Sequence, residues 1–317
     1  MALWQGFGIR RRRGAILCFH DVRNGSWLRD FLSQLRERSD VVHLSSLVEG
    51  RDGHGASATR NKGPQVALTF DDGYKSIRTV VEQVCSELHL PFTTFVCSEV
   101  LTGGPAPWCD RVSLVVRRLG SARAASYWGF VGDPGRALLP ALKEAPQRLI
   151  LDGLARAELE AAIDPRPLCN RFMREEDLAA VMRNPLVTVG SHTHSHPILT
   201  NLDPEEQRAE IFRGVGLLRR LCSTPVQYFA YPNGKLDDFD GNVIRVLHEA
   251  GLHAAVTTVQ RPVLAQDDAM ALPRLGVSEG DPIGKLEMKW TLPWVSAGDM
   301  RENWCRRRYR GLWSKHR

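Results

Sequence analysis

The sequence has 317 residues, enough for one large domain or two of ordinary size, and its apolar (43%) and charged (25%) fractions are those of a globular protein. It contains no apolar run of the ~18 residues that a membrane-spanning helix needs. The net charge of +6 is confined to residues 301–317, whose seven basic residues and one acidic residue leave 35 charges of each sign elsewhere, which excludes a nucleic-acid-binding surface on the body of the protein.

The first thirteen residues, MALWQGFGIRRRR, form a basic segment in which a short apolar part precedes the positive charge. A secretory signal has the opposite order. The seven cysteines are scattered and include no CxxC pair, which favours reduced, mostly buried thiols. We therefore expect a cytoplasmic protein.

The first hundred residues predict strands and helices in alternation. Apolar runs of strand length are followed by segments of helical spacing, and a Gly-rich, charged segment at 50–63 is expected to be a loop. The predicted strands are 14–19 (GAILCF), 65–70 (QVALTF) and 92–97 (FTTFVC), and the predicted helices are 27–38 and 77–88.

The segment 101–174 breaks this alternation. It contains short helical pieces and no clear strand, which indicates an insertion on the main fold. Because alternation on both sides of it favours a parallel sheet or barrel, we expect a barrel domain at 14–280 and a basic tail at 281–317. Beyond the insertion, the predicted helices are 175–182, 204–221 and 242–249, and the predicted strands are 186–189, 227–231, 254–257 and 272–277.

Two adjacent carboxylates, Asp71 and Asp72, follow the second predicted strand in LTFDDGY. Two such charges at one strand end are costly unless a cation or a proton compensates them. They cannot easily flank a sugar ring as a glycosidase pair, because those carboxyl groups lie ~5 Å or more apart across the scissile bond. A metal ligand beside a general base fits better, although Asp-Asp-Gly is also a common turn.

Three histidines alternate in the sequence GSHTHSHP, directly after the predicted strand 186–189. Imidazole is a favoured ligand of zinc and similar ions. Catalytic zinc sites combine three protein ligands with an open position, and two of these histidines with one carboxylate would supply them. Pro197 disfavours a helix here, so a loop must bring the ligands together.

A third segment, YFAYPNG at 228–234, leads from a predicted strand into a Pro-Asn-Gly turn. The backbone N–H groups of such a turn can stabilise an oxyanion, although on its own the segment is an ordinary turn. All three segments begin where an apolar strand ends. In βα-barrels that end of the strands carries the active site.

Together the three segments resemble the motifs of the polysaccharide deacetylase family, also called the NodB-homology family or carbohydrate esterase family 4. TFDDG resembles its first motif, HTHSH its second, and FAYPNG stands in the place of its third. The resemblance implies a distorted (β/α) barrel. It also implies a divalent metal, with zinc as our first choice, bound by Asp72, His192 and His196, and Asp71 as the general base.

The sequence departs from the family pattern in two places. Ala230 stands where the third motif usually has an arginine that braces the base, and the usual late histidine, the general acid, is not evident. His20, at the end of the first predicted strand, resembles the early acid histidine of the branch that makes de-N-acetylated exopolysaccharides. Arg274 in LPRLGV, at another strand end, is our candidate brace. The alternatives are an ordinary histidine and a surface arginine.

The resemblance implies hydrolysis of the N-acetyl group of an amino sugar, in a glycan or lipid-linked glycan, with release of acetate. Tyr231, Pro232 and Asn233 are expected to contact the substrate. Trp108 and Asp110 in the insertion would offer an aromatic face and a carboxylate, although a packed tryptophan and an N-cap aspartate are equally consistent with the sequence. The alternative functions are a non-catalytic glycan-binding relative, and a deformylase or amidase that acts on another small or lipid-linked amide.

The basic tail also suggests a peripheral membrane contact. Cys305, Tyr309, Leu312 and Trp313 recur at the spacing of one helical stripe, with arginines off it. A basic helix with an aromatic edge suits the surface of an anionic bilayer at the inner membrane face. A disordered cationic tail and a helix packed on the barrel are the alternatives.

Overall fold

The computed structural model describes residues 12–49 and 63–291. Within these ranges the strands form one sheet in the order β7-β6-β5-β4-β3-β1-β8, with β2 paired to β3 and β9 to β1. The pairing of β1 with β8 is antiparallel and the others are parallel. The strands are β1 (Arg12–Phe19), β2 (Asp40–Val41), β3 (Gln65–Phe70), β4 (Phe92–Val96), β5 (Val187–Ser191), β6 (Tyr228–Ala230), β7 (Ala254–Val256), β8 (Val263–Leu264) and β9 (Leu275–Gly276).

The central strands are covered on both faces. Every residue of β4 is buried, and so is every residue of β3 after Gln65, which explains why both sequences are continuous apolar runs rather than alternating patterns. β1 pairs in parallel with β3, with Phe19 opposite Phe70. Because both strands end at this pair, the residues that follow them, His20 and Asp71, reach the same edge of the sheet.

The sheet curls until one late segment joins its two sides. Leu272 forms a parallel bridge with Val256 of β7, and three residues later Leu275 pairs with Leu17 of β1. The segment 272–276 therefore lies between the two sides of the curl, and the sheet forms a distorted, incompletely closed barrel. The predicted α/β barrel is confirmed.

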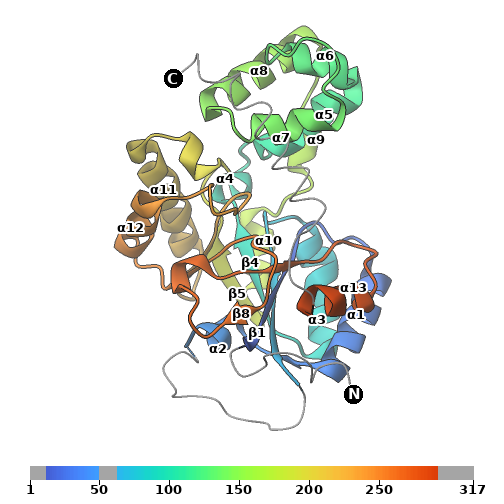
Figure 1. The fold of residues 1–317 in the computed structure, drawn as a ribbon, viewed down its shortest axis with the longest axis vertical. Helices are drawn as coiled ribbons and strands as arrows, with labels where there is room; N and C mark the ends of the chain where they lie inside the picture. Colours follow the sequence, from blue (N-terminus) through green and yellow to red (C-terminus); the bar gives the residue numbers. More distant parts are fainter. Residues whose placement is uncertain (1–11, 50–62, 292–317) are drawn as a thin grey trace.

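Helices flank the curled sheet, with α1, α3 and α13 on one side and α11 and α12 on the other (Figure 1). α11 begins as its sequence predicts: the Asp203 carboxylate accepts the backbone N–H of Glu206, the Glu206 carboxylate accepts that of Asp203, and Pro204 occupies the first turn. The flanking helices are α1 (Gly25–Arg38), α2 (Leu44–Glu49), η4 (Ile77–Val81), α3 (Glu82–Leu88), α10 (Glu175–Val181), α11 (Pro204–Leu221), α12 (Gly241–Glu249) and α13 (Ile283–Thr291).

The helical insertion stands over one end of the sheet (Figure 1). It packs around a hydrophobic cluster of its own, which includes Val112, Leu142 and Leu154. One buried member of this cluster, Ile198, comes from the loop that follows β5. The helices between β4 and α10 are α4 (Ser98–Leu101), α5 (Trp108–Leu119), α6 (Ser121–Ser126), η5 (Gly135–Ala137), α7 (Leu138–Leu142), α8 (Gln147–Glu160) and α9 (Arg166–Cys169).

Several elements differ from the sequence-based expectation. β1 begins at Arg12, inside the predicted basic N-terminal segment, and the last strand shrinks to Leu275–Gly276. The predicted helix 77–88 opens with the π-helical turn η4. α13 lies within the segment that we assigned to the tail, and its Leu286 and Trp290 are buried in the barrel core.

None of the described helices is long and apolar enough to cross a membrane. The six cysteines within the described ranges are free. The tail stripe from Cys305 to Trp313, most of the basic N-terminal segment and most of the predicted loop at 50–63 lie outside the described residues.

Candidate active site

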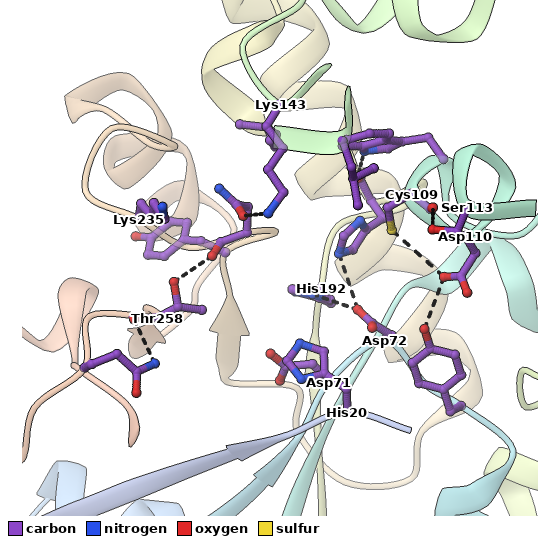
Figure 2. A pocket seen from close by; sticks show the side chains of 18 residues that line it. His20, Asp71, Asp72, Cys109, Asp110, Ser113, Lys143, His192, Lys235 and Thr258 are labelled. Carbon is purple, nitrogen blue, oxygen red and sulfur yellow. Dashed lines mark hydrogen bonds and ion pairs between the residues drawn. The ribbon is translucent and has the colours of Figure 1, made fainter. Parts of the chain in front are cut away.

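A pocket lies between the strand ends of the barrel and the insertion (Figure 2). Its lining contains most of the residues that the sequence singled out, whereas Pro232 and Arg274 are not part of it. The predicted residues in the lining are His20, Asp71, Asp72, Trp108, Asp110, His192, His196, Tyr231 and Asn233. The fold thus gathers at one place residues that are up to 213 positions apart in the sequence.

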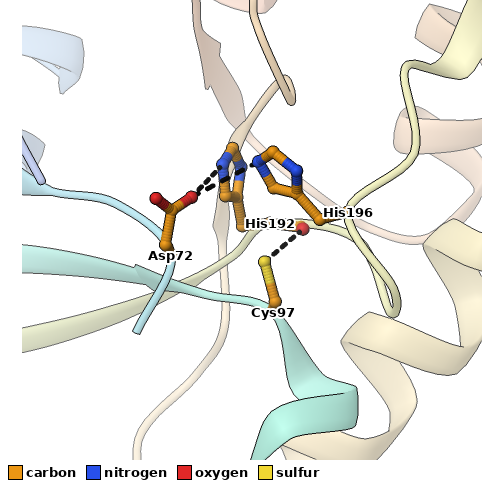
Figure 3. Close-up of side chains that lie close together, drawn as sticks. All are labelled: Asp72, Cys97, His192 and His196. Atoms are coloured by element: carbon orange, nitrogen blue, oxygen red, sulfur yellow. Dashed lines mark hydrogen bonds and ion pairs between the residues drawn. The ribbon is translucent and has the colours of Figure 1, made fainter. Parts of the chain in front are cut away.

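The predicted metal ligands converge on one point (Figure 3). The Nε2 atoms of His192 and His196 each lie 3.3 Å from Oδ1 of Asp72. Nδ1 of His192 lies 2.7 Å from the carbonyl oxygen of Ala230, which can only accept, so Nδ1 carries the proton and Nε2 presents its lone pair. Asp72 Oδ1 is buried and receives no hydrogen bond. Facing acceptors of this kind favour a cation or a proton between them.

The protonation of the metal-free site also indicates that a positive charge belongs between Asp72 and the two histidines. Burial would lower the pKa of His196, but its interactions with the Asp72 carboxylate and with Cys109 outweigh burial and raise that pKa to about 9. A proton on His196 therefore takes the place of a cation when no metal is bound. Because a histidine must be neutral to ligate, metal and proton compete for this position.

Cys97, at the end of β4, was not singled out from the sequence. Its Sγ, together with one donor atom each of Asp72, His192 and His196, forms a group whose members all lie within 4.8 Å of one another (Figure 3). The thiol donates to the backbone carbonyl of His192, at 3.4 Å. The sequence feature that could have identified Cys97 was its position directly after an apolar strand.

Four residues of the three motifs adopt left-handed backbone conformations. The φ angles are 71° at Asp72, 64° at Thr193, 65° at His196 and 60° at Asn233. For residues other than glycine such conformations cost about 1–3 kcal/mol each and persist only where the surroundings enforce them. The metal-binding and turn segments are thus held in place by the rest of the fold.

Helix α11 supplies much of that restraint to the loop after β5. Glu210 accepts the backbone N–H groups of His194 (3.0 Å) and Ser195 (2.8 Å) and the hydroxyl of Ser195 (2.9 Å). One turn later stands Gly214, where an added Cβ would lie 2.8 Å from the backbone of Thr193. Glycine therefore lets α11 approach the loop closely enough for the Glu210 carboxylate to reach it.

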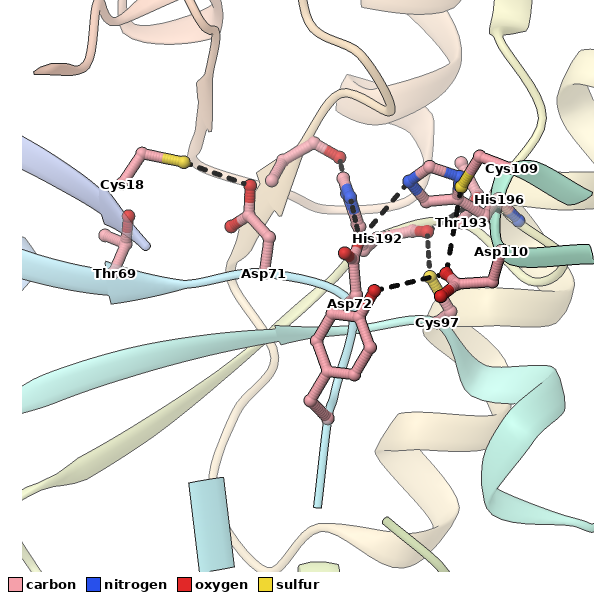
Figure 4. A network of polar contacts seen from close by, with 12 residues as sticks. Cys18, Thr69, Asp71, Asp72, Cys97, Cys109, Asp110, His192, Thr193 and His196 are labelled. Atoms are coloured by element: carbon pink, nitrogen blue, oxygen red, sulfur yellow. Dashed lines mark hydrogen bonds and ion pairs between the residues drawn. The ribbon is translucent and has the colours of Figure 1, made fainter. Parts of the chain in front are cut away.

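Asp71 accepts a hydrogen bond from the Cys18 thiol, at 3.4 Å (Figure 4), and is also paired with Arg274. The guanidinium donates to both carboxylate oxygens, at 2.7 and 2.6 Å, and its Nε donates to the carbonyl of Thr257. Burial would raise the pKa of Asp71, but the charge and hydrogen bonds of Arg274 outweigh it and hold the pKa below its ordinary value. The carboxyl group is therefore ionised at neutral pH, as a general base must be.

His20 is exposed at the mouth of the site. One of its ring nitrogens, the Cys18 sulfur and an Asp71 oxygen lie within 4.8 Å of one another. His248, by contrast, is an exposed residue of α12 and is absent from the pocket lining. The geometry thus leaves His20 beside the candidate base.

The Pro-Asn-Gly turn is fixed on both sides. The Asn233 amide donates to Asp238 (2.7 Å), and its Oδ1 accepts the ammonium of Lys143 from the insertion (2.7 Å). Tyr231 is buried, and its hydroxyl donates to the carbonyl of Met270. Lys143 was missed from the sequence, because only the tertiary path of the insertion brings it to this turn.

The two predicted insertion residues are held by hydrogen bonds. Trp108 is 3% exposed and donates its indole N–H to the carbonyl of His196, at 3.1 Å. Asp110 accepts the guanidinium of Arg171 (2.7 Å) and the hydroxyl of Tyr74 (3.1 Å). Both line the pocket, and their contacts with a sugar stay a prediction.

A family comparison agrees with the resemblance of the motifs. Residues 148–255, which are 108 of the 317 residues, match the polysaccharide deacetylase family, a range that includes HTHSH and FAYPNG but not TFDDG. The match supports a hydrolase that acts on carbon–nitrogen bonds. A search of curated proteins found no significant match.

Solved structures share the fold of this chain at low sequence identity. The Streptococcus pyogenes deacetylase PplD, in complex with acetate, is 13% identical, with a TM-score of 0.58 over 88% of this chain and 98% of that one. IcaB from Ammonifex degensii is 18% identical, with a TM-score of 0.53 over 88% and 97% of the two chains. The BpsB deacetylase domain from Bordetella bronchiseptica is 16% identical, with a TM-score of 0.53 over 84% and 96%.

Proposed function

We propose that this protein hydrolyses the N-acetyl group of an amino sugar, in a glycan or a lipid-linked glycan, and that a divalent metal, with zinc the first choice, is bound by Asp72, His192 and His196. One observation carries the proposal. The Nε2 atoms of two histidines each lie 3.3 Å from one carboxylate oxygen of Asp72, and beside them lies a second carboxylate that Arg274 keeps ionised.

The residues fit a divalent cation because the donors are two imidazoles and a carboxylate, a set that suits zinc, and the pocket opens onto them. A metal bound there would polarise the acetyl carbonyl and lower the pKa of a water molecule. The backbone contact of His192 with Ala230 fixes its ring orientation before any metal arrives.

The chain's own residues then divide the proton transfers. Asp71 removes a proton from the attacking water as the new C–O bond forms. The backbone N–H of Asn233, presented by its left-handed turn, donates to the oxyanion. His20 gives a proton to the sugar nitrogen as the C–N bond breaks, so acetate and a free amine leave. Arg274 keeps the Asp71 carboxylate oriented throughout.

The remaining predicted residues are proposed to bind the sugar. Trp108, Asp110, Tyr231 and Asn233 all line the pocket into which the proposed metal ligands point. Pro232 is proposed to shape the turn that carries Asn233. Asp110 would accept sugar hydroxyls with the oxygen valences that Arg171 and Tyr74 leave open.

Mass spectrometry tests the proposal. Zinc-loaded protein is incubated with acetylated chito-oligosaccharides and with lipid-linked acetamido sugars, and we expect the loss of ~42 Da that hydrolysis of an acetamide predicts. Asp71→Asn, which keeps the metal ligands, is the control. Metal binding without acetate release from any acetylated sugar would instead support a glycan-binding relative, and release of formate from an N-formylated amino sugar incubated in parallel would support a deformylase.

A further inference from the structure

The metal ligand His196 is held from two directions. Its backbone N–H donates to the hydroxyl of Thr193, within the same loop, at 3.0 Å. Its carbonyl accepts the indole N–H of Trp108, across 88 positions of the sequence, at 3.1 Å. Glu210 on α11 binds the two preceding residues and not His196 itself. The insertion therefore makes the contact that reaches this ligand's own backbone from outside the loop.

A second contact joins the same loop to the insertion. Ile198, two residues after His196, is 2% exposed and belongs to the hydrophobic cluster of the insertion, as Trp108 does. Since His196 has a φ of 65°, its backbone needs such external restraint to stay in position. A polar and an apolar contact from the insertion thus fix the two ends of the segment 196–198.

The other two ligands depend on the barrel instead. His192 is bound through Nδ1 to the carbonyl of Ala230 in β6, and its N–H donates to the carbonyl of Val96 in β4. Asp72 follows β3 directly. A disturbance of the insertion should therefore displace one ligand of the three and leave the other two in place.

We propose that Trp108 is a positioning residue for His196, so that the inserted helical segment is part of the metal site and not only a wall of the substrate pocket. This inference rests on the proposed metal site. Metal binding and packing of the insertion then stabilise each other, because the metal binds only when His196 is in position. Partners that orient metal ligands typically affect metal affinity by about 10–100-fold.

The chain offers a matched control. Trp128 is 4% exposed, belongs to the same hydrophobic cluster, and donates its indole N–H to the carbonyl of Ile150 at 3.2 Å. Trp108→Phe and Trp128→Phe each remove one buried N–H donor and a similar volume. The carbonyl that loses its donor belongs to the proposed metal ligand His196 in Trp108→Phe and to Ile150 in Trp128→Phe.

The test measures zinc affinity by competition with a chromophoric chelator, without any sugar. We expect Trp108→Phe to bind zinc about tenfold or more weakly than wild type and Trp128→Phe to bind within about twofold. Equal affinities of the two variants would overturn the proposal. A tryptophan that only contacts sugar would change KM and leave zinc affinity alone.

A second measurement uses the wild-type protein and does not depend on the folding of any variant. Hydrogen exchange is compared with and without zinc, and we expect zinc to slow exchange of the amides of α5, which begins at Trp108. Unchanged exchange in α5 alongside protection of the loop at 192–198 would overturn the proposal. Wild-type protein that binds no zinc would refute the proposed metal site itself, which is a distinguishable result.

Discussion

The barrel and the insertion contribute to the pocket in different ways. The barrel presents the proposed base, its arginine and two of the proposed metal ligands from strand ends that are buried and joined by parallel pairing. The insertion packs around a separate hydrophobic cluster and reaches the site by contacts with the loop at 196–198 and the turn at 233. If the proposed function is correct, the barrel supplies the proton chemistry, and the insertion affects metal geometry and substrate fit.

The largest effect should follow loss of a metal ligand. His192→Ala and His196→Ala each remove one of three donors, and we expect metal analysis to show nearly complete loss of bound metal from both variants. Full occupancy in both would remove these histidines from the ligand set. Greater retention in His196→Ala would sharpen the comparison, because the barrel-held pair, Asp72 and His192, would still be in place.

Removal of the base should cost turnover and spare the metal. Asp71→Asn is expected to lower kcat by about 10²–10⁴-fold, the range for general acid–base catalysis, at unchanged metal content. Activity within about tenfold of wild type would exclude Asp71 as the base. Measured beside Trp108→Phe, this variant separates the chemistry of the barrel from the metal geometry that the insertion supports.

Arg274→Met should destabilise the barrel by about 3–5 kcal/mol, because it leaves a fully buried carboxylate uncompensated. The surface pair of Arg29 and Glu87, with both side chains more than 40% exposed, supplies the control, and Arg29→Met should cost under about 1 kcal/mol. Denaturant unfolding of the metal-free proteins measures both. Equal small losses would show that the buried pair contributes no more than an exposed one.

The same variant makes a prediction about pH. In wild type the pKa of Asp71 is lowered, so its contribution to stability is present above the ordinary carboxyl pKa and is lost as pH falls through the lowered value. In Arg274→Met the strongest interaction that opposes burial is gone, and we expect burial to raise that pKa, so that the folded state binds more protons than the unfolded state and stability falls as pH rises above about 4. The difference between the two proteins should therefore widen from pH 4 to pH 7.

The smallest of these effects is expected at His20, because this residue is exposed and its surroundings hold it less firmly than Arg274 holds Asp71. His20→Ala should lower kcat by about a hundredfold, near the lower limit for an acid–base group, and the pH–rate profile should lose its alkaline limb. His248→Ala, on the surface of α12, should leave both unchanged. An unaltered alkaline limb in His20→Ala would assign the acid to another group.

The sequence predicted the barrel more closely than the insertion, for physical reasons. QVALTF matches β3 at both ends, because a strand covered on both faces is mostly apolar, here in every residue but Gln65 and Thr69. β8 and β9 have two residues each, which is too short for a strand pattern to be recognised in the sequence. In α13 the apolar residues Ile283, Leu286 and Trp290 recur at helical spacing. We did not predict this helix because it follows the last predicted strand, in the segment assigned to the tail.

Individual side-chain contacts were likewise easier to predict in the barrel than in the insertion. The structure brings Arg274 onto Asp71, and the strand-end position of LPRLGV had indicated that contact. Lys143 on Asn233 and Trp108 on His196 depend on how the insertion folds back over the barrel, which no local pattern encodes. Whether Trp108 or Asp110 contacts sugar stays a prediction.

The pairing of Asp71 with Arg274 also sets an order of events during folding. The two residues are 203 positions apart, and Arg274 lies in the segment that joins the two sides of the curled sheet. During synthesis the first four barrel strands along the chain can pair long before this arginine has emerged, but burying Asp71 without it would carry the cost of a lone charge. We therefore expect closure around Asp71 to be a late, non-local step that slows folding, and chains that end before residue 274 to stay open at this edge.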